Sequence, residues 1–380
     1  MQDRIVITAY TVYSPLGNSI QELWTNLWHH QSALREHDFL QQEKFRFPKA
    51  CLMHPYPEGY ETDRGWNLTE RGIADLVLQA EIKLPEQTGL FFGSTLGESA
   101  LLEQAALHSD TNTTKAYANY WARRIQAKYH LHGPAVAYGT ACAAGNYAIG
   151  QAADYMRYFD LDIAIAGASE PFSRIAMAGF NRSRAMSNDY CKPFDQAHNG
   201  MVLGEGAAFF LLEKEDHARQ RKAPMLAEVK SLGLSCDAYH ATAPKPDGSG
   251  MLAAMQKALC LANLTPDAID WVCAHGSGTI ASDEAELNAL NDLFKQCSPW
   301  LSAYKGATGH TLGAATAIEL AICIKGLQEQ AIPKSSNLVN PMPSQHIQFC
   351  TENKSVPLAT ILNCGYAFGG INSALILSAC

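Results

Sequence analysis

The stretch TACAAGNYAIGQAA, residues 140–153, decides the fold. It begins a predicted helix over Cys142–Tyr158 whose first turns carry small residues on every side, whereas an ordinary surface helix would show a polar stripe. A second helix of the same kind is predicted over His310–Leu327. Because small side chains let neighbours approach from all directions, we predict that the two helices pack together in the centre of the molecule.

Strand-like segments surround these two helices. Apolar, β-branched runs alternate with Ala- and Gly-rich stretches, a pattern typical of an α/β fold with mostly buried strands. The predicted strands are Ile5–Ala9, Thr88–Gly93, Ala135–Tyr138, Ile163–Ala168, Ala207–Leu212, Trp271–Ala274, Thr360–Asn363 and Ala374–Ser378.

The paired helices also indicate an internal duplication. Each follows a short turn, Tyr138–Ala141 in one case and Gly306–Gly309 in the other. We therefore predict two similar α/β halves, residues 1–220 and 221–380, although sequence identity between them is too weak to show a repeat. The charged stretch Lys214–Pro224 is the predicted connector, and we expect it to be solvated.

Composition excludes several classes of protein. A chain of 380 residues, 47% hydrophobic and 17% charged, can bury a large core. Its net charge of −8 argues against a nucleic-acid partner, because phosphate binding needs a basic face. No stretch approaches about 18 apolar residues and the N-terminus runs directly into a strand, so we predict a cytoplasmic protein without a membrane span. The eleven cysteines lack a repeated short spacing, which favours reduced thiols over disulfides or a metal site.

Cys142 is a candidate nucleophile. A thiol in the first turn of a buried helix lies near unpaired backbone N–H groups and the positive end of the helix dipole, which together should lower its pKa. A Cys in an Ala-rich helix is, however, more commonly a small buried core residue. Position alone leaves both roles open.

Polar residues of the second half add to this candidate site. His275 follows a strand within the segment Cys273–Thr279, and His310 begins the second predicted helix. Lys305 precedes that helix and Glu319 lies on it, and because unpaired Lys and Glu are rarely buried we predict an ion pair between them. A lone His at a strand end is more often structural. A nucleophilic Cys with two such histidines, however, favours an acyl-transfer site.

A Gly-rich turn closes the last strands, within Asn363–Asn372. Such a turn lets backbone N–H groups approach a substrate oxygen. It is equally compatible with a tight turn between two core strands. It is not a phosphate-binding loop, because no Gly-x-Gly-x-x-Gly opens a helix after a strand here.

Together these elements resemble the β-ketoacyl-synthase branch of the thiolase-like superfamily, over nearly the whole chain. The ordered matches are Ile7–Tyr10, Ser14–Gly17, Gly93–Gly97, Thr140–Gly145, Pro193–Asp195, Gly204–Ala207, Asp237–His240 and Pro246–Gly248, followed by the His275, Lys305–His310 and Phe368–Gly370 elements. The resemblance implies a thiolase-like fold, in which two similar α/β halves form a layered αβαβα sandwich. It also implies a decarboxylating condensing enzyme that joins acyl and malonyl units.

The resemblance assigns roles to the candidate catalytic residues. Cys142 would take an acyl group, as a thioester, from the phosphopantetheine of an acyl-carrier protein. His275 and His310 would hold the malonyl thioester carbonyl while CO2 leaves, as neutral imidazoles that donate through one nitrogen. Lys305 and Glu319 would be the buried pair that orders this site. No cofactor bound by the enzyme itself is implied.

It also assigns binding residues around the nucleophile. The backbone N–H groups of Cys142 and Phe368 would form an oxyanion hole, and Phe368 would gate the pocket. Ser277 and Thr279 would hydrogen-bond the pantetheine arm. Leu96 and Phe180 match positions that limit the acyl tunnel, and ordinary core packing is the alternative for both. Arg184 matches a contact for an acidic carrier protein, and a solvated surface charge is the alternative.

Some features depart from the family pattern. The segments from Leu16 to Cys142 and from Glu170 to Pro193 are shorter than in housekeeping fatty-acid synthases. His198–Gly200 replaces a usual Arg-Asp-Gly, and Ala367 replaces the first Gly of a usual Gly-Phe-Gly-Gly. These departures favour a specialised polyketide or polyene pathway enzyme over a housekeeping elongase.

Three alternatives remain to be weighed. A catalytically silent chain-length-factor subunit would replace the nucleophile, which is present here. A non-decarboxylating thiolase would carry a catalytic Cys near the C-terminal Gly turn, where we interpret Cys364 as structural. A binding scaffold without activity would require four independent coincidences.

For the assembly, a homodimer is the family default, and a heterodimer with a chain-length-factor-like subunit is the strongest competitor.

Overall fold

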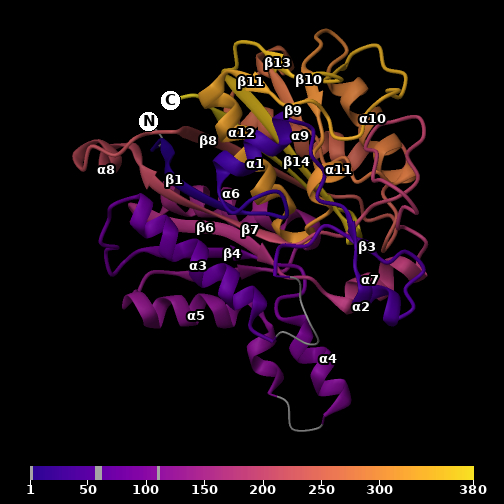
Figure 1. Ribbon diagram of the computed structural model, residues 1–380. Coiled ribbons are helices and arrows are strands. Elements are labelled where there is room, and N and C mark those ends of the chain that lie inside the picture. Colours follow the sequence, from indigo (N-terminus) through magenta and orange to yellow (C-terminus); the bar gives the residue numbers. More distant parts are fainter. Residues whose placement is uncertain (1–2, 56–61, 109–111) are drawn as a thin grey trace.

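The computed structural model describes residues 3–55, 62–108 and 112–380. Its largest sheet has eleven strands in the order β12-β10-β9-β14-β15-β8-β1-β7-β6-β4-β5 (Figure 1). These strands are β1 (Ile5–Tyr13), β4 (Gly89–Gly93), β5 (Ala135–Tyr138), β6 (Ile163–Glu170), β7 (Gly206–Lys214), β8 (Ala227–Cys236), β9 (Trp271–Cys273), β10 (Trp300–Ser302), β12 (Gln348–Phe349), β14 (Thr360–Ala367) and β15 (Ile371–Ser378).

The two sides of this sheet repeat one topology. They meet where β1 pairs with β8, over only two residue pairs. On one side β1, β7 and β6 are antiparallel and β6, β4 and β5 are parallel. On the other side β8, β15 and β14 are antiparallel and β14, β9 and β10 are parallel. The predicted pair of similar halves is therefore confirmed, while the division at residue 220 stays a prediction.

Helices cover both outer faces and fill the space between the halves. The helices are α1 (Ile20–Trp28), α2 (Asp38–Gln42), α3 (Arg64–Gln79), α4 (Ser99–Leu107), α5 (Ala118–Tyr129), α6 (Ala144–Tyr158), α7 (Arg174–Arg182), α8 (Glu215–Gln220), α9 (Ser249–Ala262), α10 (Ile280–Leu293), α11 (Lys305–Thr308) and α12 (Ala315–Glu329). Helices α3 and α5 pack on the N-terminal strands, and α9, with α10 beside it, packs on the C-terminal ones (Figure 1). Helix α6 contacts β4, β6 and β8, and α12 contacts β7 and β14. This is the predicted αβαβα sandwich.

The two central helices pack against each other closely, as predicted. A Cβ atom added at Gly145 would lie 2.6 Å from the Thr316 hydroxyl oxygen and 2.7 Å from the Ala317 backbone nitrogen. The Asn146 backbone N–H donates to the Thr316 hydroxyl at 2.9 Å. The Asn363 side chain on β14 donates both to the Asn146 side chain and to the Thr316 carbonyl, each at 2.9 Å. A buried amide network thus ties both helices to the C-terminal half of the sheet.

Both central helices begin slightly later than the sequence indicates. Each is preceded by a short 3-10 turn, Ala141–Ala143 before α6 and Leu312–Ala314 before α12. The prediction that the turn Gly306–Gly309 directly precedes the second helix, as Tyr138–Ala141 precedes the first, was wrong, because the turn before α12 is Leu312–Ala314. Residues 305–308 instead form α11, and Gly309, with φ 72°, ends it.

Several strands differ from prediction. All eight predicted strands are present, and β1 and β14 extend beyond their predicted ends. The ten-residue β8 was missed because charged and small residues interrupt its apolar run, and β10 and β12 are too short to give a pattern. Short pairs were also missed, namely β2 (Arg35–Glu36) with β3 (Lys49–Ala50) and β11 (Ala331–Ile332) with β13 (Lys354–Ser355).

The predicted connector holds a short helix, α8, at the surface. Its charges are largely paired, for example Arg219 with Glu215 at 2.5 Å, and Arg221 beyond the helix with the buried Glu213 at 2.6 Å. Among the described residues, no helix has the length and apolar character that crossing a membrane requires. A cytoplasmic location stays a prediction.

Candidate active site

Cys142 lies in the 3-10 turn between β5 and α6, at the centre of the molecule. The residue before it, Ala141, has a φ of 48°, a left-handed conformation that non-glycine residues rarely adopt. Residues in such conformations cluster at functional sites, where the surrounding packing enforces them. The turn exposes 8% of Cys142, which lines a cavity of about 240 Å³.

The expected lowering of the Cys142 pKa is wrong for this geometry. Burial raises the pKa of the thiol to about 12, although the charge of Lys305 acts in the opposite direction. The desolvation of a thiolate in this apolar setting is the largest cause of the raised pKa. The group in the turn is therefore a neutral thiol, and its proton must leave during the reaction.

His275 is held by its backbone just beyond β9. Its N–H and that of Gly276 each donate to one oxygen of the buried Glu286 carboxylate, both at 2.8 Å. The His275 carbonyl accepts a short hydrogen bond from the Lys305 ammonium group. Its ring Nδ1 is buried and has no hydrogen-bond partner among the described residues. The main chain is thus fixed while the ring stays available to a ligand.

His310 follows Gly309 and faces His275. The ring centroids lie 5.3 Å apart at 75°. Its Nδ1 accepts the Leu312 backbone N–H at 3.1 Å, so in the neutral ring the proton must be on Nε2. Burial, followed by the charge of Lys305, lowers the pKa of His310 well below its ordinary value, and the same causes with a contribution from His310 lower that of His275. Both imidazoles are neutral near pH 7.

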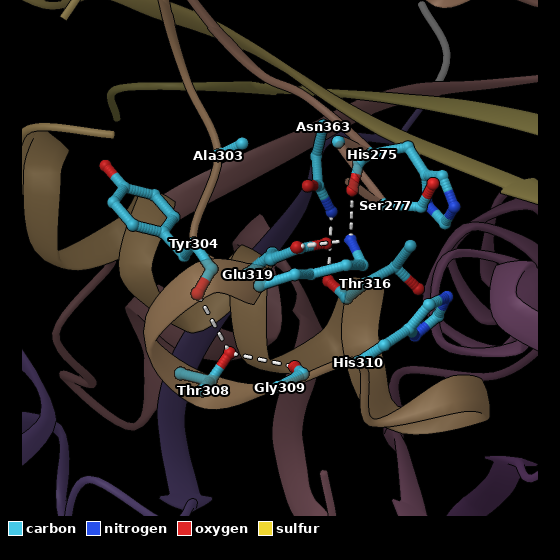
Figure 2. A network of polar contacts seen from close by, with 12 residues as sticks. His275, Ser277, Ala303, Tyr304, Thr308, Gly309, His310, Thr316, Glu319 and Asn363 are labelled. Carbon is cyan, nitrogen blue, oxygen red and sulfur yellow. Dashed lines mark hydrogen bonds and ion pairs between the residues drawn. The ribbon is translucent and has the colours of Figure 1, made fainter. Parts of the chain in front are cut away.

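Lys305 and Glu319 form the predicted buried ion pair. The ammonium nitrogen lies 2.6 Å from Glu319 Oε1, with side-chain exposures of 1% and 4%. Figure 2 shows Glu319 beside the His275 carbonyl, with Asn363 and Thr316 from the helix network adjacent. Burial acts to lower the pKa of Lys305, but Glu319 and other nearby groups together raise it above its ordinary value, so the lysine stays charged. This positive charge adds to burial in lowering the pKa values of both imidazoles.

The cavity brings the predicted residues of both halves together. Its lining includes all three members of the Cys-His-His set and the following predicted binding residues: Ser277, Thr279, Phe180 and Phe368. The hydroxyls of Ser277 and Thr279 lie 2.8 Å apart. Phe368 is 44% exposed, and its ring centroid lies 5.6 Å from that of Phe180, which also lines the cavity.

Besides the buried pair Lys305–Glu319, two predicted residues lie outside the cavity lining. Leu96 packs against the apolar cluster that contains Cys142, but it does not line the cavity. Arg184 is exposed in the turn after α7, in a left-handed conformation with φ 59°. Their roles in the acyl tunnel and in carrier docking stay predictions.

Sequence reasoning missed some residues of the site. Tyr366 and Asp237 line the cavity, and the Tyr366 ring lies edge-on to His275 with centroids 5.8 Å apart. The buried carboxylates of Asp283 and Glu286 on α10 bind the loop that carries His275. The sequence held a signal for Asp283 and Glu286. They are acidic residues three positions apart in a helix that directly follows the His275 loop.

Comparison with known proteins identifies the family. Residues 66–218 match the family model described as beta-ketoacyl synthase, N-terminal domain, and residues 226–339 match beta-ketoacyl synthase, C-terminal domain. The chain belongs to the β-ketoacyl synthase family. Members of this family are condensing enzymes of the acyltransferase class.

Relatives of this β-ketoacyl synthase match along its full length. It is 30% identical to 3-oxoacyl-[acyl-carrier-protein] synthase 2 of Coxiella burnetii, over 99% of this chain and 98% of that protein. Among solved structures, the ishigamide ketosynthase/chain length factor is 29% identical with a TM-score of 0.93. A beta-ketoacyl synthase from Burkholderia phymatum STM815 is 27% identical with a TM-score of 0.89. Each structural match covers 100% of both chains.

A thiolase, the alternative weighed above, would carry a catalytic Cys near the C-terminal Gly turn. In this β-ketoacyl synthase Cys364 is fully buried within β14 and does not line the cavity. The residue at the Gly-Gly turn is Phe368. Among the described residues that line the cavity, the only thiol is that of Cys142 and the only imidazoles are those of His275 and His310.

Proposed function

We propose that this β-ketoacyl synthase condenses an acyl group held on Cys142 with a malonyl unit, both delivered on the phosphopantetheine of an acyl-carrier protein. The observation that carries the proposal is the meeting of the Cys142 thiol with two neutral imidazoles in one cavity. The product is a β-ketoacyl thioester for fatty-acid-like, polyene or polyketide biosynthesis.

The first half-reaction loads the nucleophile. The Cys142 sulfur attacks the acyl thioester, a new C–S bond forms, the bond to pantetheine breaks, and the thiol proton passes to the departing pantetheine sulfur. The backbone N–H groups of Cys142 and Phe368 would stabilise the oxyanion formed on the way. Ser277 and Thr279, whose hydroxyls lie 2.8 Å apart at the cavity wall, would hydrogen-bond the pantetheine arm.

The second half-reaction makes the carbon–carbon bond. His310, with its proton on Nε2, and His275 would donate to the malonyl thioester oxygen, so that the electrons released with CO2 form a stabilised enolate. The enolate carbon attacks the acyl group on Cys142, the C–S bond breaks, and the thiolate takes up a proton. Neutral donors suit this step because they add no charge that must be desolvated when the enolate forms.

Arg184 is the proposed contact for the acidic carrier protein. It is exposed just past α7, close to Phe180 and Ser183, which line the cavity. A cation at the mouth of the cavity would steer an acidic carrier protein toward the thiol.

The shorter segments and replaced motif residues that distinguish this chain from housekeeping synthases favour a specialised biosynthetic pathway.

A second subunit is proposed at the edge of the sheet that β5 forms. Strand β5 pairs with β4 on one side, and no described strand pairs with its other side. Free edges of this kind are rarely left uncovered. The partner would be a second copy of the chain or a chain-length-factor-like subunit.

A decarboxylation assay tests the proposed roles of the histidines. His275→Ala and His310→Ala should each slow CO2 release from malonyl-carrier protein by about 100-fold or more, the scale of losing one oxyanion donor. Both variants should still form the acyl adduct on Cys142, measured by intact mass. Retention of wild-type CO2 release by both variants would refute the assignment.

A further inference from the structure

Glu170 is a buried carboxylate at the end of β6 that the reaction above does not use. It is 0% exposed, and both of its oxygens accept hydrogen bonds. Oε2 accepts the N–H of Thr95 at 2.5 Å and that of Gly313 at 3.0 Å. Oε1 accepts the N–H of Leu96 at 3.0 Å and the Ser94 hydroxyl at 3.3 Å. Four donors from two distant segments thus converge on one side chain.

Gly313 is the counterpart of Cys142 in the second half. Each is the middle residue of the 3-10 turn before a central helix, and each follows a left-handed residue, Ala141 with φ 48° and Leu312 with φ 45°. At one turn the N–H is proposed to bind a reaction oxyanion, and at the other it binds the Glu170 carboxylate. A Cβ at Gly313 would lie 2.6 Å from Glu170 Oε2, so only glycine permits this approach.

The two segments that Glu170 joins have different tasks. On one side, the residue before Gly313 is Leu312, whose N–H binds Nδ1 of His310 and fixes its tautomer. On the other side, Leu96 packs against the apolar cluster around Cys142. One carboxylate therefore links the turn that follows His310 to the loop that carries Leu96.

We propose that Glu170 is a positioning residue that holds His310 and the loop Ser94–Leu96 in one arrangement, and so governs both malonyl decarboxylation and acyl-chain selectivity. The proposal rests on the proposed function of Cys142 and His310. Burial raises the pKa of Glu170 to about 7 against the lowering effect of its N–H donors. Assays at about pH 8 therefore keep the carboxylate ionised.

The test is Glu170→Gln. The substitution replaces one carboxylate oxygen, which accepts hydrogen bonds, by an amide NH2 group that would face the hydrogen-bond donors described above. Decarboxylation of malonyl-carrier protein should fall about tenfold or more, the effect of losing one hydrogen bond to a charged group. The ratio of kcat/KM between octanoyl- and acetyl-carrier protein should change about fivefold or more by the same loss. Acetyl loading of Cys142, followed by intact mass, should not fall, because no group that touches the sulfur is changed and losing the Glu170 charge acts to lower the pKa of the thiol.

A second variant approaches the same contact from the other side. In Gly313→Ala the added methyl group would separate Oε2 from its donors. It should change decarboxylation and selectivity in the same direction as Glu170→Gln. Glu170→Asp keeps the charge and both acceptors, and it should recover part of the decarboxylation rate.

The matched control is Glu213→Gln, a fully buried carboxylate at the far end of the neighbouring strand. Glu170 pairs with Gly206 and Glu213 with Ile163, so the two lie seven residues apart along the strands, roughly 23 Å at about 3.3 Å per residue. The control should lose stability but keep the decarboxylation rate and selectivity of the folded protein. The proposal is overturned if Glu170→Gln and Gly313→Ala both keep the wild-type decarboxylation rate and selectivity, as this control should.

If the wild-type chain neither loads acyl groups nor releases CO2, the proposed function fails and this proposal with it.

Discussion

At the scale of single residues, the site depends on one buried positive charge. Lys305 is 1% exposed, pairs with Glu319 and donates to the carbonyl of His275. Its charge adds to burial in lowering the pKa values of His275 and His310. A cation that is itself compensated by a carboxylate can thus keep two neighbouring imidazoles neutral.

The first prediction concerns these pKa values. Removing the charge in Lys305→Met should raise the pKa of both histidines, because a nearby positive charge disfavours their protonation. In the wild-type protein, NMR signals of the His275 and His310 rings should show no titration near the ordinary value of 6.5. The variant should shift the midpoints upward. A wild-type midpoint near 6.5 for either ring would contradict the account.

The same substitution should reduce stability. It leaves Glu319 buried without its partner, which costs about 3–5 kcal/mol, measured from the urea midpoint. Lys325→Met is the matched control, because Lys325 pairs with a half-exposed Glu329 on the same helix, and it should cost no more than about 1 kcal/mol. Equal losses in the two variants would count against a special role for the buried pair.

The sequence allowed the residue types of the site to be predicted, but not their ionisation. Cys142, His275, His310 and the Lys305–Glu319 pair are placed together as expected. The pKa of Cys142 was predicted in the wrong direction, because local helix position suggests a lowered value while burial by distant segments raises it. Burial is a tertiary property, so local sequence gives no measure of it.

At the scale of elements, the site is made by two matching turns on two touching helices. Helices α6 and α12 approach closely because Gly145 leaves room for Thr316 and Ala317. Their small residues were the strongest signal in the sequence, and the predicted pairing is confirmed. The match between their turns was assigned to the wrong residues, because positive φ at Leu312 cannot be recognised from an ordinary leucine.

The helix contact yields a stability prediction. In Gly145→Ala the new methyl group would press on the Thr316 hydroxyl and on backbone atoms of α12, at a cost of about 1–3 kcal/mol. Gly179→Ala is the matched control, since Gly179 lies in α7 with no atom within 4 Å of an added Cβ. It should stabilise the protein by about 0.5–1 kcal/mol. Comparing urea midpoints checks both values, and a neutral Gly145→Ala would contradict the close packing.

At the scale of the whole molecule, two halves of the same topology form one layered body around the site. The thiol comes from the N-terminal half, and both imidazoles come from the C-terminal half. Alternating strands and helices predicted this architecture, whereas β8 was missed because its polar interruptions hide a central strand. What could not be predicted is which strands form the two edges of the sheet, β12 and β5.

The open edge of β5 yields an assembly prediction. The Pro134 carbonyl accepts from the Leu90 N–H and the Tyr138 carbonyl from the Ser94 N–H, so alternate residues of β5 face β4. Ala137 then turns its N–H to the open edge. Ala137→Pro should block edge pairing and give a monomer by light scattering, since proline removes that donor. Ala137→Val keeps the N–H and should stay dimeric; a dimeric Ala137→Pro would exclude β5 from the interface.

The most direct test of the account is the acyl adduct on Cys142. After incubation with acyl-carrier protein, intact-mass spectrometry of the wild-type chain should show one added acyl group, and peptide mapping should place it on Cys142. Cys142→Ala should show no adduct and no condensation product. An acyl adduct that persists on Cys142→Ala would contradict the account.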